Sequence, residues 1–336
     1  MRIALDAMGA ERGARIVIEG AVAAIRENSR VKVLLVGEER RIKKELAKLS
    51  VKKSLFTLVP ASQVVTMNDT PAETLKEKRD SSIAVAAELV RQDSAEAMVS
   101  CGNTGVVMAT ALVKLKKLEG VRRPCLAVSL PTLSSERVIL TDVGANVDCR
   151  PAHLLQFALM GSLYANSLLG KKSPRVGLLN IGTEAGKGGE VLAQTFRLLQ
   201  QSALNFVGNV EGNDIISGKI DVVVCDGFVG NTILKFAESF AITTLNIIKQ
   251  EIGESSSELG DFFSRKWLAR VRKNLDYSEY GGIPLLGING VCIIAHGAST
   301  SKAVKNAILI GYEFAQSNIN QSIKSALRKN QEAVEQ

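Results

Sequence analysis

The sequence has little of what several common protein classes need. Aromatic residues make up only 4% of the chain, which argues against stacking platforms for single-stranded nucleic acid. Only two histidines occur, His153 and His296, which argues against a histidine-rich metal site. No uninterrupted apolar run approaches the roughly 18 residues of a transmembrane helix, and the N-terminus has no long apolar signal core. We therefore expect a chain without metal, without a nucleic-acid partner and at most lying on a membrane.

The cysteines are too few and too scattered for a disulfide framework. Their number is odd, no two form a CxxC pair, and most sit in apolar strings. Buried free thiols in a reducing cytoplasm fit this pattern best. The five are Cys101, Cys125, Cys149, Cys225 and Cys292.

Positive charge is in excess. The chain has 42 lysines and arginines against 34 acidic residues, a formal net charge of +8. Such an excess favours anionic partners: phosphate-bearing molecules, an acidic carrier protein or an anionic membrane surface. A merely solvated basic surface would give the same composition.

Short apolar runs alternate along the chain with longer helical patterns. "RIAL" precedes "ARIVIEGAVAAIRE", "KVLLVG" precedes "EERRIKKELAKL", and "RVGLLN" precedes "GEVLAQTFRLLQ". Apolar strands alternating with amphipathic helices predict an α/β fold, a three-layer sandwich around a largely parallel sheet. No linker or repeat divides the chain. We expect a single domain over 1–336, a helical excursion near 231–276, and a polar C-terminal tail at about 320–336 that ends as a frayed helix.

Six predicted strands are followed by loops that combine glycine with Asp or Asn. Glycine lets the backbone approach a ligand closely, and open parallel sheets bind ligands at the carboxyl ends of their strands. We therefore expect the six loops to meet at one edge of the sheet as a composite site, although each alone is an ordinary turn. They are "DAMGAE" (6–11), "CGNTG" (101–105), "DVGAN" (142–146), "NIGTEAGKGG" (180–189), "EGNDI" (211–215) and "DGFVGN" (226–231).

The loop at 180–189 is not a nucleotide-binding P-loop. Only three residues separate Gly182 from Gly186, and Gly188 stands where that motif needs a hydroxyl. Backbone N–H groups and Lys187 still predict an anion site that needs no metal. The sequence also lacks GxGxxG and GxSxG motifs, so we expect no cofactor and no visible serine nucleophile. A reaction in which the substrate is itself the nucleophile fits well.

The motifs "DAMG", "GNTG", "DVGANVDCRP", "NIGTEAGKG", "EGNDI" and "DGFVGN", in this order, resemble the bacterial phosphate acyltransferases of phospholipid synthesis. The resemblance runs from residue 2 to about 315. It departs from the family pattern at Ala10, Glu11 and Thr183. It implies the fold of the phosphate acetyltransferases and of the isocitrate and isopropylmalate dehydrogenases.

The resemblance also implies a reaction. Inorganic phosphate attacks the thioester of a long-chain acyl carrier protein, and the acyl phosphate product passes to a membrane glycerol-3-phosphate acyltransferase. The family is homodimeric, cytoplasmic and peripherally attached to the membrane, and it needs no metal or nucleotide.

Three residues are our candidates for catalysis. Lys187, with the N–H groups of 186–189, is expected to bind phosphate. Asn231 is expected to donate to the oxyanion or to phosphate, although a plain helix cap is equally compatible with its position. His296 is the second choice, as proton donor to the leaving thiolate. A Cys225 nucleophile is disfavoured, because "VVVC" reads as a buried strand.

The remaining candidates for substrate binding are expected to line or brace the pocket. Any one of them alone is as readily a loop cap. They are Asp6, Gly102, Asn103, Thr104, Asp142, Asn146, Asn180, Gly182, Glu184, Gly186, Gly188, Asn213, Asp226 and Gly227.

The segment 258–275 combines apolar residues at helical spacing with a basic face. We expect it to lie on an anionic membrane or to receive the acidic carrier, with a core or dimer helix as the alternative. The contact residues would be Phe262, Phe263, Arg265, Lys266, Trp267 and Arg270. Two rival functions remain: a short-chain phosphotransacetylase-like enzyme using coenzyme A or a dehydrogenase of the same fold group, and a non-catalytic scaffold for lipid enzymes.

Overall fold

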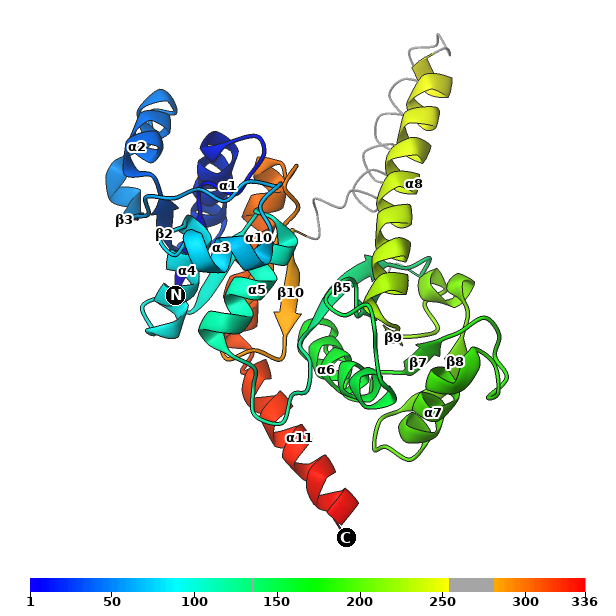
Figure 1. The fold of residues 1–336 in the computed structure, drawn as a ribbon. Coiled ribbons are helices and arrows are strands. Elements are labelled where there is room, and N and C mark those ends of the chain that lie inside the picture. The colour runs from blue at the N-terminus through cyan, green and yellow to red at the C-terminus, as the bar shows by residue number, and fades with distance from the viewer. Residues whose placement is uncertain (135, 254–280, 336) are drawn as a thin grey trace.

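The computed structural model describes residues 1–134, 136–253 and 281–335. Two lobes are built on one continuous sheet (Figure 1). Within the described residues the sheet has the strand order β3-β2-β1-β4-β11-β10-β5-β6-β9-β7-β8. The strands are β1 (Arg2–Asp6), β2 (Lys32–Gly37), β3 (Phe56–Pro60), β4 (Ala97–Ser100), β5 (Cys125–Pro131), β6 (Arg137–Thr141), β7 (Val176–Leu179), β8 (Phe206–Val210), β9 (Val222–Val224), β10 (Ile283–Leu286) and β11 (Cys292–Ile294).

Helices cover both faces of the sheet, so the predicted three-layer α/β sandwich is confirmed (Figure 1). Residues of β1 alternate between two core clusters: Ile3 and Leu5 belong to one, and Ala4 belongs to the other. Burial on both faces is why these strands read as continuous apolar runs. The helices are α1 (Ala14–Glu27), α2 (Glu39–Lys48), α3 (Pro71–Glu77), α4 (Ser82–Arg91), α5 (Thr104–Leu115), α6 (Pro151–Leu169), α7 (Gly189–Gln200), α8 (Gly227–Gly253), α10 (Ser301–Gln316) and α11 (Ile319–Glu335), with short 3₁₀ turns at Lys53–Leu55 and Gly212–Ile216.

Strand direction reverses in the middle of the sheet. β1, β2, β3, β4 and β11 are mutually parallel. β10 is antiparallel to both β11 and β5, and β5 is antiparallel to β6. β6, β9, β7 and β8 are parallel to one another and therefore run opposite to the first group. The expectation that all six loops leave one edge of the sheet is wrong.

Sheet twist still lets loops from the two groups meet. Adjacent strands rotate by about 20–25°, so four steps from β4 to β6 accumulate roughly 80–100°. The two groups of strands run in opposite directions according to their pairing, but after this rotation they cross at an angle closer to about 90°. The carboxyl ends of β4 and β11 can therefore face those of β6 and β9 across the cleft between the lobes.

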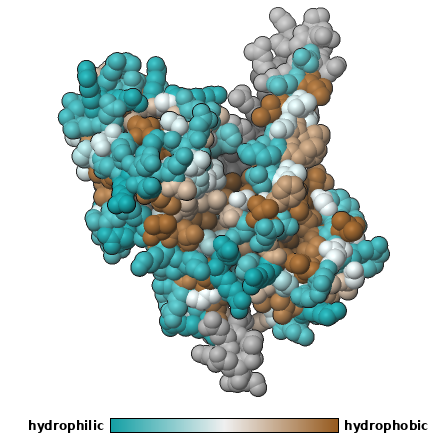
Figure 2. Space-filling view, in the orientation of Figure 1, coloured by the Kyte–Doolittle hydropathy of each residue, from teal (hydrophilic) through white to brown (hydrophobic). Residues whose placement is uncertain are grey.

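Helix α8 is the described part of the predicted helical excursion. It has 27 residues, and it projects away from its lobe as the long yellow helix of Figure 1. Its surface carries apolar side chains: Phe236 is 69% exposed and Phe240 is 61% exposed. Brown patches follow this helix in Figure 2. The predicted contact residues Phe262, Phe263, Arg265, Lys266, Trp267 and Arg270 lie outside the described residues.

The C-terminal segment, expected to be polar and to end as a frayed helix, forms helix α11 (Ile319–Glu335). Ile319, Ile323 and Leu327 are buried at a spacing of four residues, and α11 packs against α6. The apolar stripe was short enough to be hidden among polar neighbours.

Two other expectations can be compared with the structure. All five cysteines are free, and four of them are buried; Cys149 is only partly buried. None of the helices in 1–134, 136–253 and 281–335 is sufficiently long and apolar to cross a membrane.

Candidate active site

A largely apolar cavity of about 470 Å³ lies where the two lobes meet. One wall is the side of α8, and the opposite wall comes from β5 and the segments around β10 and β11. Three predicted residues line it, Thr104, Asn231 and His296, and they follow β4, β9 and β11 respectively. The structure therefore brings together loops from both strand groups, as the accumulated twist allows.

The buried carboxylate of Asp142 organises the loop that follows β6. Its side chain is fully buried and accepts from the backbone N–H groups of Leu126 (2.9 Å), Ala145 (3.2 Å) and Asn146 (2.7 Å). The side-chain amide of Asn146 also donates to it at 2.9 Å. Burial raises the pKa of Asp142, and these hydrogen bonds offset part of that rise. Asp142 therefore braces the loop.

The start of α8 is held against the same loop. The carbonyl oxygen of Asn146 accepts from Gly227 N–H at 2.7 Å. The Asp226 carboxylate accepts from Val229 N–H at 2.9 Å and so caps the helix. A side chain on Gly230 would overlap the carbonyl of Asp142. This close approach fixes the position of Asn231, the next residue of the helix, at the cavity wall.

A second braced pair lies after β1 and β4. The buried Asp6 carboxylate accepts from Ser100 Oγ at 2.6 Å and from the N–H groups of Met8 and Gly9. A side chain on Gly9 would overlap the backbone N of Gly102. Asn103 caps α5 through Val106 N–H at 3.2 Å, and its amide also donates to two carbonyls of the 67–69 loop. These bonds place Thr104 at the cavity.

The 180–188 loop is also held by its own side chains. Asn180 donates to the Lys187 carbonyl at 2.9 Å and accepts from Ile181 N–H at 2.8 Å. Gly188 has a positive φ of 84° at the N-cap of α7, where a side chain would overlap Asn180. Asn180 is therefore a brace that shapes the glycine-rich turn.

Lys187 itself stands at the surface. Its ammonium group is half exposed and lies 4.0 Å from the Glu184 carboxylate. Lys187 is not among the described residues that line the cavity. However, its loop leaves β7, which pairs directly with β9, so it emerges at the same edge as the start of α8. Phosphate binding by Lys187, with Gly182 and Gly186 in the same loop, stays a prediction.

His296 lines the cavity from the other strand group. Its Nδ1 accepts from Ala298 N–H at 3.1 Å. In the neutral ring this leaves the proton on Nε2, which can donate.

Asn213 is exposed in the turn Gly212–Ile216, and its neighbour Gly212 lines the cavity.

Sequence reasoning missed the apolar walls of the cavity. Alternate residues of β5, Leu126, Val128 and Leu130, line it. From α8, Phe236 and Phe240 line it with their rings stacked at 5.8 Å. The phenylalanines stand four apart in "FAESFA", which is the signal that could have revealed a shared helical face.

The arrangement combines largely apolar walls with polar side chains that include Asn231 and His296. Such a site can hold a long apolar group and offer donors to an oxygen or sulfur at its head. No cluster of three or more His, Cys, Asp or Glu side chains suited to a metal ion occurs within the part of the chain that the structure describes.

Comparison with known proteins gives full-length matches. A family model described as "Fatty acid synthesis protein" matches residues 1–322. The phosphate acyltransferase of Geotalea uraniireducens is 47% identical over 331 residues, covering 98% of this chain and 95% of that protein. The phosphate acyltransferase of Desulforamulus reducens is 46% identical over the whole of both chains.

Solved structures show the fold at much lower identity. The EutD phosphotransacetylase from Staphylococcus aureus has a TM-score of 0.63 at 16% identity, with 94% of each chain covered. A branched-chain phosphotransacylase from Enterococcus faecalis has a TM-score of 0.63 at 13% identity, with 94% of this chain and 99% of that chain covered. At such identities the likeness is one of fold alone.

Proposed function

Because the chain belongs to the fatty acid synthesis protein family and is an acyltransferase akin to the phosphate acyltransferases, we propose that it transfers a long-chain acyl group from acyl carrier protein to inorganic phosphate. An oxygen of phosphate attacks the thioester carbonyl carbon and forms a tetrahedral intermediate. The carbon–sulfur bond then breaks. The products are an acyl phosphate and the free thiol of the carrier, with no metal or cofactor taking part.

Three side chains have separate roles in this proposal. Lys187 and the N–H groups of its loop bind and aim the phosphate. The Asn231 amide donates to the oxyanion that develops on the carbonyl oxygen. His296 donates the Nε2 proton to the departing sulfur, although a thiolate with an ordinary pKa near 8.5 also leaves unaided.

The observation that carries the proposal is the largely apolar cavity that Asn231 lines. Its volume of about 470 Å³ and its walls of Leu126, Val128 and Phe236 suit an alkyl chain. An acetyl group would occupy little of this space. Each buried methylene adds about 0.8 kcal/mol of binding, so the cavity favours a long-chain substrate over the coenzyme A-dependent, short-chain alternative. A non-catalytic scaffold would leave the cavity without a purpose.

The finer parts of the proposal concern where the product goes. We include a homodimer, reversible attachment to an anionic membrane surface from the cytoplasmic side, and delivery of acyl phosphate to a membrane glycerol-3-phosphate acyltransferase. The basic segment 258–275 is the proposed membrane contact and lies outside the described residues.

The decisive experiment compares substrates with the purified chain. Palmitoyl carrier protein, palmitoyl-coenzyme A and acetyl-coenzyme A are each incubated with phosphate, and acyl phosphate is trapped with hydroxylamine. We expect the carrier thioester to give the highest kcat/KM and acetyl-coenzyme A the lowest. Preference for acetyl-coenzyme A would support the short-chain alternative, and no turnover with any donor would support the scaffold.

A further inference from the structure

Four cations gather on one surface at the start of α6. They belong to the loop before β5 and to the end of the 142–150 loop. All four are exposed, and we call them the basic patch: Lys117, Arg122, Arg123 and Arg150.

The patch is fixed by hydrogen bonds from the main chain and from Lys117. The N–H of Arg122 donates to Gln156 Oε1 on α6 at 2.8 Å. The N–H of Arg150 donates to His153 Nδ1 at 3.2 Å, one turn earlier on that helix. Lys117 Nζ donates to the Arg122 carbonyl at 3.0 Å. Two separate segments of chain are thus tied to the first turns of one helix.

The three guanidinium groups of the patch have no ion pair among the residues that the structure describes. Elsewhere many exposed arginines are paired: Arg15 with Glu19 at 2.9 Å, for example. The nearby carboxylate of Asp148 makes no salt bridge with the patch either. Burial lowers the pKa of the adjacent His153, and the three arginines lower it further. Positive charge is therefore concentrated here without compensation.

The patch borders the candidate site. Arg123 is three residues from Leu126, a wall of the cavity, which limits their Cα separation to about 11 Å. Arg150 is four residues from Asn146, which holds the first N–H of α8. β5 is antiparallel to β6, so the start of one and the end of the other share an edge. Val147 adds an apolar side chain, 63% exposed, in the 142–150 loop.

We propose that the basic patch docks the acidic surface of the protein that carries the acyl thioester, so that its flexible arm enters the cavity beside Asn231. This inference rests on the proposed function. Uncompensated cations at the rim of a site attract an anionic partner, accelerate encounter and make it dependent on salt. Because the arginines have no partners of their own to lose, docking breaks no existing ion pair.

The test removes the positive charges of the three arginines of the basic patch and varies the acyl donor. The variant Arg122→Gln/Arg123→Gln/Arg150→Gln is assayed at low salt with palmitoyl carrier protein, palmitoyl-coenzyme A and palmitoyl-pantetheine. We expect kcat/KM for the carrier to fall roughly tenfold or more, and its salt dependence to flatten. Palmitoyl-pantetheine, which has neither protein nor nucleotide, should react as with the unaltered chain.

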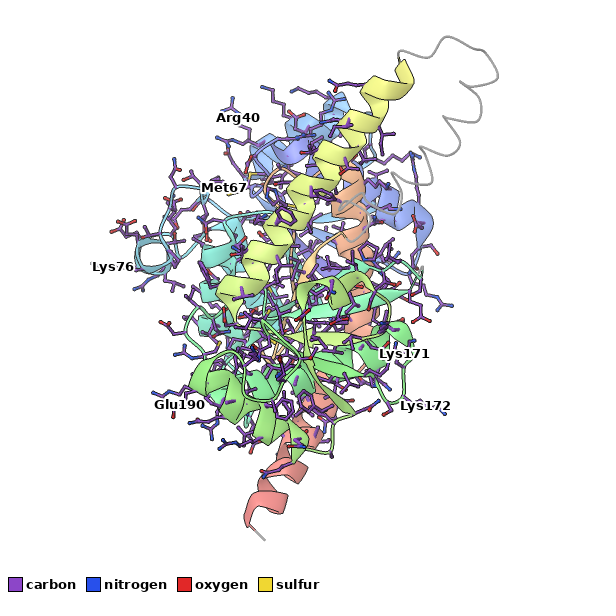
Figure 3. The ribbon with its side chains drawn as sticks, turned by 90° about the vertical axis from the view of Figure 1, so that its right-hand side faces the viewer. Arg40, Met67, Lys76, Lys171, Lys172 and Glu190 are labelled. Carbon is purple, nitrogen blue, oxygen red and sulfur yellow. The ribbon has the colours of Figure 1, made fainter. Side chains whose placement is uncertain are left out.

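A matched control removes the same number of positive charges elsewhere on the surface. Arg40, Lys76 and Lys172 are exposed cations that lie apart from one another in Figure 3. Arg40→Gln/Lys76→Gln/Lys172→Gln should leave the carrier kinetics unchanged. An equal loss in this control, or an equal loss with palmitoyl-coenzyme A in the triple variant, would overturn docking of an acidic protein surface. So would a triple variant with unaltered carrier kinetics. An unaltered chain that makes no acyl phosphate from the carrier would instead refute the proposed function.

Discussion

The side-chain amide of Asn146 donates to the buried carboxylate of Asp142 at 2.9 Å. The backbone carbonyl of Asn146 accepts the first N–H of α8, that of Gly227, at 2.7 Å. One asparagine thus connects the loop after β6 to the helix after β9. Asn231 sits one turn into that helix. The position of a proposed catalytic amide is therefore set by a buried carboxylate that does not line the cavity.

Asn231→Ala should lower kcat for the carrier thioester by roughly 10²–10³-fold, because an oxyanion donor is lost.

Lys187→Ala should instead raise KM for phosphate by about tenfold or more, as expected when a charged hydrogen bond is removed. Steady-state kinetics with phosphate and thioester varied separately distinguish the two effects. If both variants retain full turnover, the site assignment is wrong.

Ala241→Trp should shorten the preferred acyl chain, because Ala241 lines the cavity from α8. Each methylene that no longer fits costs about 0.8 kcal/mol, or roughly fourfold in kcat/KM. The control Ser239→Trp places the same bulk on the exposed side of α8, at a residue outside the cavity lining. Competition between palmitoyl and hexanoyl donors measures the shift. An equal change in both variants would contradict an acyl cavity.

Asp142→Asn should lower the free energy of unfolding by about 2 kcal/mol, because an amide NH₂ would face two N–H donors and leave them unsatisfied. Burial raises the pKa of Asp142 in the folded state. Its contribution is therefore greatest below the unfolded pKa and declines as pH rises through the folded pKa. Denaturant unfolding at several pH values should show this decline in the unaltered chain. The decline in the free energy of unfolding should be absent from Asp142→Asn. If it persists in that variant, another titrating group causes it.

Cys225→Ala should keep turnover within about threefold. The thiol is buried, and burial with nearby Asp142 and Asp226 raises its pKa well above the usual value. A thiol of this kind is a poor nucleophile. Rapid-quench experiments with radiolabelled acyl carrier should reveal no acyl-enzyme. A trapped acyl group on Cys225 would establish a two-step mechanism.

Much of the fold could be predicted from the sequence because strand and helix periods are local. The reversal of strand direction could not. It depends on β10, residues 283–286, which inserts between β11 and β5. Its partner in β5 lies about 160 residues earlier in the chain, and neither segment encodes that pairing by its own pattern.

Loop composition pointed to three residues that line the cavity, Thr104, Asn231 and His296, but did not separate them from residues that brace the loops. The side chains of Asp142 and Asn180 form hydrogen bonds that hold the backbone around them. Asn231 is an asparagine like Asn180 and ends a similar glycine-containing motif, yet it lies one turn into α8 and lines the cavity. Helix caps and ligand contacts use the same side chains, so only the three-dimensional arrangement can tell them apart.

The two lobes are joined by the shortest ladders in the middle of the sheet. β10 pairs through two residue positions with β5 and through two with β11, whereas β5 and β6 pair through five. We predict that bending between the lobes concentrates in this narrow strip, with β10 as the hinge. Amide hydrogen exchange at Leu285 and Leu286 faster than at Val128 and Leu140 would reveal it; equal protection would mean that the lobes move as one body.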